Sequence, residues 1–225
     1  MFYLPFFDPN IILRIISSPN SAFVQIRDNE EKYFLQSIGI FVLASVLSVL
    51  IMLPFVMIPL DERYFEGVDA ATFSSDELDP VLFVAISLLS VFISTVLLYF
   101  IGKKLGGNTN WKKVFSVFFH ANVPTIPMSV VLSILIFLMM DSFASIDPSS
   151  IMESDIDEKQ VLSMMGPVLA YVALFVITAI AYVVWIFVVS VKAVKIVNGF
   201  GTAKAFGLII LVMIISSVIT TPFEM

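Results

Sequence analysis

Five stretches of the chain contain no Asp, Glu, Lys or Arg over a length close to or beyond that of a membrane span: Phe34–Leu60, Val81–Ile101, Val114–Met140, Val161–Val191 and Ala205–Phe223. About 20 helical residues, at about 1.5 Å each, cross the roughly 30 Å of hydrocarbon in a bilayer, and the last stretch only just reaches that length. The 225 residues are 59% apolar and only 13% charged, so a water-soluble fold of this size could not bury them. We therefore predict an all-α integral membrane bundle of five transmembrane helices within residues 34–223.

Positive charges alternate along the chain. Ten of the 12 Lys and Arg residues lie before the first stretch, between the second and third, and between the fourth and fifth. The other two, Arg63 and Lys159, lie in the intervening loops. Because short loops rich in Lys and Arg remain in the cytoplasm, this pattern predicts a protein of the cell membrane with its N-terminus in the cytoplasm and its C-terminus outside.

The two predicted outer loops are acidic and explain most of the low isoelectric point. The sequence "ESDIDE", Glu153–Glu158, offers carboxylates of the kind that hard divalent cations bind, but its spacing matches no EF-hand loop. A solvated loop is the favoured interpretation. We predict no cofactor and, with a net charge of −6, no nucleic-acid partner.

Residues 1–33, ahead of the first stretch, mix apolar and charged side chains. No basic region precedes the apolar start, and Asp8 and Pro9 interrupt it early, so we expect no cleaved signal peptide. Four isoleucines then follow at helical spacing, namely Ile11, Ile12, Ile15 and Ile16. They predict a short amphipathic segment that lies in the cytoplasmic membrane interface. A helix that binds a partner protein is the alternative.

The only histidine of the chain, His120, lies in the apolar run "FSVFFHANVPTIPMSVV". Pro124 lacks the N–H that would bond to the carbonyl of His120, and Pro127 likewise leaves the carbonyl of Val123 without its helical donor. This pattern predicts a break in the third helix, with the side chains of His120 and Asn122 nearest to the freed carbonyls.

Two further interpretations of this stretch remain open. Asn122 is a candidate N-cap for a spanning helix over 123–140, which would leave Trp111–Ala121 as a helix in the interface. The functional interpretation is a proton relay at His120, since ionisable groups inside membranes are costly and tend to be functional. The five stretches hold no acid or base that would partner the histidine, so a structural role is favoured.

Serines form a stripe on each of the first two predicted helices: Ser37 and Ser48 on the first, and Ser87, Ser90 and Ser94 on the second. Small residues at such spacing let membrane helices approach closely and share hydrogen bonds. We predict that these stripes pack helices, within one chain or between copies of it. A polar path for a substrate is the alternative.

Enzyme signatures are missing from the sequence. It contains no GxxxxGK[ST], HExxH or GxSxG motif, no cysteine, and too few histidines for a multi-histidine metal site. We therefore predict that the protein is not an enzyme.

Two segments carry a family likeness: "SPNSAFVQI" ahead of the first stretch, and "YFIGKKLGGNTNWKKVFSVFFHANVP" between the second and third. Together they resemble the Yip1 domain family of multi-pass membrane proteins, over roughly Pro19 to Phe223. The resemblance implies five spans with a cytosolic N-terminus. It also implies structural roles for the residues at the turn and at the helix break, which are Gly102, Gly106, Gly107, His120, Asn122 and Pro124.

Eukaryotic members of that family are linked to vesicle trafficking and to lipidated small GTPases, through a long cytosolic region with a DLYGP-type motif. This sequence has no such motif and only about 33 residues ahead of the first stretch. The difference argues against GTPase binding and makes a prokaryotic-type member the closer likeness.

Two classes of function fit these observations. The first is a non-enzymatic membrane protein that organises lipid or partner proteins, with the bilayer, other membrane proteins or a second copy as its partners. The second is a small transporter or channel with His120 and Asn122 at a helix break. Five spans do not divide into two equal repeats, and the spans lack acids and bases, so the first class is favoured.

Overall fold

The computed structural model describes residues 8–51, 80–146 and 158–220, and in these ranges every regular element is a helix. The short helices near the N-terminus are α1 (Pro9–Ser17) and α2 (Pro19–Asp28). They are followed by α3 (Glu30–Ser48) with the 3-10 turn η1 (Val49–Ile51), α5 (Pro80–Lys104), α6 (Trp111–His120), α7 (Thr125–Ala144), α9 (Glu158–Asn198) and α10 (Thr202–Thr220). The all-α prediction is confirmed.

Five helical segments are long and apolar enough to cross a membrane, as the sequence predicts. They are Glu30–Ile51, Val84–Lys104, Trp111–Ala144, Leu162–Asn198 and Thr202–Ile219. The first span begins at Glu30 rather than at Phe34, and the fourth continues past Lys192 and Lys195 to Asn198. The predicted ends of the first and last spans, 52–60 and 221–223, lie outside the described residues.

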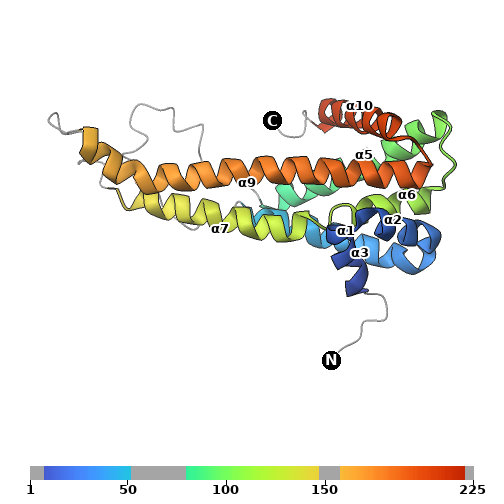
Figure 1. The fold of residues 1–225 in the computed structure, drawn as a ribbon, viewed down its shortest axis with the longest axis horizontal. Helices are drawn as coiled ribbons and strands as arrows, with labels where there is room; N and C mark the ends of the chain where they lie inside the picture. The colour runs from blue at the N-terminus through green and yellow to red at the C-terminus, as the bar shows by residue number, and fades with distance from the viewer. Residues whose placement is uncertain (1–7, 52–79, 147–157, 221–225) are drawn as a thin grey trace.

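Helix α9 is the axis of the molecule and has 41 residues. Figure 1 shows it running the length of the fold, with α7 beside one half and the remaining helices gathered around the other half. The Oγ1 atom of Thr125 in α7 and the hydroxyl of Tyr182 in α9 form a hydrogen bond of 2.8 Å. Since α7 begins at this contact and ends near the start of α9, the two helices run antiparallel, and α9 continues past the start of α7.

The second half of α9 packs against α2, α6 and α10. The ends of α5 and α9 and the start of α10 meet here, bringing Lys103, Lys104, Lys192, Lys195 and Lys204 to one end of the molecule, which we call the lysine-rich end. The opposite part, in which α7 accompanies α9 from Glu158 to Tyr182, we call the two-helix arm. Both parts are apolar, and the large buried cluster of the described residues lies mainly at the lysine-rich end.

The core at the lysine-rich end includes the N-terminal helices. Ile11 and Ile15 of α1 and Phe23 and Ile26 of α2 are all at most 1% exposed, and α2 packs on α6 and α9. These short helices are amphipathic and turn apolar side chains toward the protein core, while the location of the segment in the membrane interface stays a prediction. Of the four isoleucines expected on one face, Ile16 is exposed.

Candidate functional site

The helix break lies between α6 and α7, where residues Ala121–Pro124 form turns. The carbonyl of His120, which has lost the proline donor, accepts the N–H of Val123 at 3.0 Å instead. Asn122 turns back and donates from Nδ2 to the carbonyl of Phe118 at 3.1 Å. Backbone N–H groups in tighter turns thus bond to the carbonyls that the prolines free, since the N–H of Ile126 likewise donates to the carbonyl of Val123 at 3.2 Å. The side chains of His120 and Asn122 bond instead to carbonyls four residues earlier.

The start of α7 differs from the capped helix considered in the sequence. Pro124 occupies its N-cap position and no side chain caps it. Pro127 lies in the first turn of α7, where a backbone N–H has no partner within the helix, so its missing N–H costs no hydrogen bond. Asn122 does not cap α7, and α6 is a separate helix, as in the alternative that the sequence left open.

His120 is the last residue of α6 before the break, and its side chain is fully buried. Its Nδ1 lies 2.7 Å from the carbonyl oxygen of Ser116. Because a carbonyl oxygen can only accept, Nδ1 carries the proton, and Nε2 is left as an acceptor with no donor among the described residues. The ring packs edge-on against Tyr33 of α3, with centroids 6.1 Å apart.

Tyr33 continues this contact into a chain of hydrogen bonds that ties α1, α2 and α3 together. Its hydroxyl accepts from Nε2 of Gln25 at 2.7 Å and donates to Oδ2 of Asp8 at 3.1 Å. Nη1 of Arg14 donates to Oε1 of Gln25 at 2.8 Å. The backbone of Asp8 exchanges two bonds with the side-chain amide of Gln36, at 3.2 and 3.3 Å. Sequence reasoning missed this network because its members are separated by up to 28 residues and follow no helical spacing.

The glycine turn after α5 has a specific geometry. Gly106 has φ +86°, the N–H of Gly106 donates to the carbonyl of Lys103, and the N–H of Gly107 donates to that of Gly102 at 2.9 Å. This is a Schellman motif, which requires a left-handed residue that glycine adopts at least cost. The turn therefore ends α5 without an exposed run of free carbonyls.

Gly102 and Gly107 have a second role, because the side chain of Asn198 at the end of α9 lies directly against both. A Cβ at Gly102 would lie 2.7 Å from Oδ1 of Asn198, and one at Gly107 would lie 2.5 Å from it. Asn198 is 3% exposed and donates from Nδ2 to the carbonyl of Val194 at 3.1 Å. Its buried Oδ1 has no hydrogen-bond donor among the described residues. The glycines thus allow α5 and α9 to meet closely at the lysine-rich end.

The Yip1 domain model matches residues 13–221, nearly the whole chain. The chain belongs to the Yip1 domain family. The match starts within α1 and ends one residue beyond α10, so it includes α2, the glycine turn, the helix break and the five candidate spans. Neither the curated proteins nor the solved structures give a significant match to it.

Basic side chains bind helix ends in this Yip1 domain. Nη1 of Arg27 in α2 donates to the carbonyl of Ile196 near the end of α9, at 3.2 Å. Nζ of Lys204 in α10 donates to the carbonyl of Leu105, just after α5. Cations are favourable at helix C-termini, where carbonyl groups leave a partial negative charge. These two residues therefore hold α2 and α10 against the ends of α9 and α5.

The serine stripes of the Yip1 domain are divided between local and long-range contacts. Ser37 and Ser48 donate to carbonyls of their own helix, those of Phe34 and Ser45, each at 2.6 Å. Ser94 of α5 instead meets Ser216 of α10, with their hydroxyl oxygens 2.9 Å apart. The remaining stripe residues, Ser87 and Ser90, are half-buried. Among the described residues, the stripe contact that joins two helices is Ser94 to Ser216, and it lies within the chain.

No group of three or more metal-ligating side chains occurs within the described ranges. Of the acidic sequence "ESDIDE", only Glu158 at the start of α9 is described. Among the described residues, the buried side-chain polar atoms without a hydrogen-bond partner are Nε2 of His120, Oδ1 of Asn198 and the Oγ atoms of Ser116 and Ser129. Nε2 and Oδ1 are acceptors that lack a donor.

Proposed function

We propose that this Yip1-domain protein is a non-enzymatic membrane protein that organises anionic lipid at its lysine-rich end. The observation that carries the proposal is a set of exposed lysines without counter-charges. Lys103, Lys104, Lys195 and Lys204 are exposed and have no carboxylate partner among the described residues. Lys112, at the start of α6, is also exposed.

The exposed lysines favour anionic headgroups through electrostatic attraction. A lysine near an anionic membrane surface contributes about 1 kcal/mol of attraction, so several of them together favour acidic headgroups over neutral ones substantially. Among the described residues, the buried core beneath them contains no Asp, Glu, Lys or Arg, and His120 forms a hydrogen bond with a backbone carbonyl. The proposal takes the lysine-rich end as cytoplasmic, as the charge pattern predicts.

The test measures lipid selectivity. The protein is reconstituted with spin-labelled phosphatidylserine or phosphatidylcholine, and the fraction of motionally restricted label is compared. We expect selectivity for phosphatidylserine that falls toward that for phosphatidylcholine in the triple variant Lys103→Gln, Lys104→Gln, Lys112→Gln. Lys159→Gln, at the far end of α9, is the matched control and should change nothing. Equal restriction of both lipids by the unaltered protein would refute the proposal.

A transporter or channel is the second candidate, and the buried Nε2 of His120 beside a helix break favours it. Its test is solute and ion flux from liposomes that contain the protein, with His120→Gln and Asn122→Ala as variants. Substrate-selective flux that both variants abolish, with a pH dependence between about 5 and 8 that the histidine change removes, would support it over the first proposal. Absence of flux, with intact selectivity for anionic lipid, would favour the organiser.

A further inference from the structure

The lipid-facing surface of α9 is longer than an ordinary bilayer is thick. From Leu162, which is 65% exposed, to Val188, which is 42% exposed, α9 presents apolar side chains to the surroundings. At about 1.5 Å per residue this stripe measures about 39 Å, against about 30 Å of hydrocarbon. Over the described side chains from Leu162 to Val188, only Val168 is buried.

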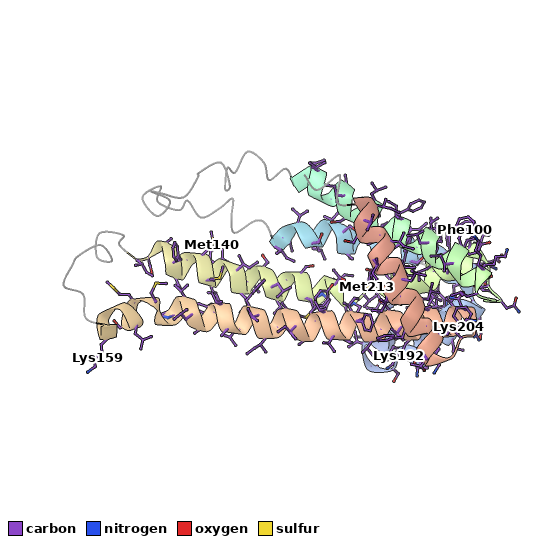
Figure 2. All side chains as sticks on the ribbon, turned by 90° about the horizontal axis from the view of Figure 1, so that it is seen from above. Phe100, Met140, Lys159, Lys192, Lys204 and Met213 are labelled. Atoms are coloured by element: carbon purple, nitrogen blue, oxygen red, sulfur yellow. The ribbon has the colours of Figure 1, made fainter. Side chains whose placement is uncertain are left out.

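The charges of α9 set the limits of the stripe independently. Lys159 lies at one end of the helix and Lys192 near the other, as Figure 2 shows, and no charged residue lies between them. The partner helix α7, with 20 residues, is about 30 Å long and matches one bilayer. Helix α10 has 19 residues, and Figure 2 shows it crossing α9 obliquely. If α10 stands near the membrane normal, then α9 is tilted.

Tilting α9 brings the whole stripe into hydrocarbon only at the largest tilt angles found for membrane helices. At the common tilt of about 20°, a 39 Å stripe still covers about 37 Å along the membrane normal. At about 40°, the upper end of the observed range, it covers about 30 Å. In a thin bilayer no usual tilt brings the whole stripe into hydrocarbon.

We propose that lipid covers α9 along its whole length from Leu162 to Val188, with the helix steeply tilted in average bilayers and best matched by thicker ones. The partner is thus a bilayer of long-chain lipid around the two-helix arm. The inference rests on the length and charge limits of α9 and not on the lysines, so it does not depend on the proposed selectivity for anionic lipid.

The test uses the absence of native cysteine. Single cysteines replace Leu162, Leu169, Val184 or Lys159, the last being an exposed reference. Each protein is reconstituted in phosphatidylcholine with monounsaturated chains of about 14, 18 and 22 carbons, and labelling by a membrane-impermeant maleimide present on both sides is timed. Met213→Cys, 56% exposed on α10, is the control for a position within the span in every bilayer.

We expect Leu162→Cys and Leu169→Cys to react at least about tenfold more slowly than Lys159→Cys in the two thicker bilayers. In the thinnest one, Leu162→Cys should approach the rate of the reference, while Val184→Cys and Met213→Cys remain slow. Fast labelling at 162 and 169 in the thicker bilayers would overturn the proposal, because the arm would then stand in water. Slow labelling at 162 in all three bilayers would also overturn it, because protein rather than lipid would then cover the site.

Discussion

The two halves of α9 have similar apolar sequences but different surroundings. Beyond Val188, five of the residues up to Val197 are buried by α2, α6 and α10, namely Val189, Val191, Ala193, Val194 and Val197. Before it, from Leu162 to Val188, every described side chain except that of Val168 is exposed or half-exposed. In a water-soluble protein, a helix face that no other helix covers would be polar. In a membrane, lipid covers such a face in place of protein, so the face is apolar.

The half of α9 that packs against protein is therefore marked by buried polar residues and by glycines around it, and not by a higher hydropathy. His120, Ser116 and Asn198 are buried at the lysine-rich end, and Gly102 and Gly107 permit the closest helix contact there. A polar side chain is more costly against hydrocarbon, which offers no hydrogen-bonding group, than within protein, and a glycine allows a neighbouring helix to approach. The following predictions contrast the two regions, beginning with the largest effect.

Truncation of a large side chain should cost much more at the lysine-rich end than in the arm. Phe23→Ala on α2 removes a fully buried ring and should lower the free energy of unfolding by about 3–5 kcal/mol. Phe137→Ala on α7, where the ring is 43% exposed, is the matched control and should cost clearly less. Equilibrium unfolding in mild detergent measures both. Equal losses would mean that α2 is not packed as the structure has it.

At the lysine-rich end, an added methyl group should have effects of opposite sign at a packed glycine and at an open one. Gly102→Ala places a methyl group 2.7 Å from Oδ1 of Asn198 and should destabilise the fold by about 1–3 kcal/mol. Gly207→Ala on α10, where an added Cβ meets nothing within 4 Å, should be neutral or slightly stabilising. The same unfolding measurement applies.

A double variant makes the glycine prediction specific. If the clash with Asn198 is the cause, then Gly102→Ala should cost less in a background that carries Asn198→Ala. An unchanged cost in that background would assign the effect to some other contact of Gly102.

Removing one hydroxyl tests the polar network beneath the N-terminal helices. Tyr33→Phe retains the ring against His120 but removes the bonds to Gln25 and Asp8, and should cost about 1 kcal/mol. Tyr171→Phe in the arm is the control and should have a smaller effect. Protease sensitivity of α1 and α2 gives a second measurement, since loosening should be confined to those helices. A larger loss for Tyr171→Phe would contradict the proposed importance of the network.

The smallest effect concerns an exposed ion pair. Nε of Arg27 donates to Asp28 at 2.8 Å, and this hydrogen bond lowers the pKa of Asp28 from its usual value of about 3.9. The stabilisation is therefore present above that value and is lost as the pH falls through the lower, folded-state pKa. Asp28→Asn should reduce the melting temperature slightly at pH 7 and not at all in strong acid. A difference that grows on acidification would contradict this assignment.

The sequence predicts the elements of this fold better than their assembly. Hydropathy identifies the five spans because each span is one continuous apolar segment whose length is set by the membrane thickness. Pro124 locates the break because the N–H that it lacks would bond to a carbonyl only one helical turn away. The packing of α2 on α9, and of Asn198 on Gly102, joins segments about 100 residues or more apart. Sequence periodicity does not encode such contacts. The spacing of the isoleucines of α1 therefore predicts a helix in the membrane interface or one that binds a partner protein, and not the burial of Ile11 and Ile15 within the chain.

The pairing of α2 with the end of α9 has a consequence for how the chain is made. Arg27 and its acceptor carbonyl at Ile196 are 169 residues apart. At a synthesis rate of about 5–20 residues per second, the ribosome adds that carbonyl about 10–30 s after the arginine. During this interval Phe23 and Ile26 have no finished site to enter, whereas α3 and α5 already exist. The first helices of the chain are thus among the last to reach their final place, and a chain released before residue 196 leaves them undocked.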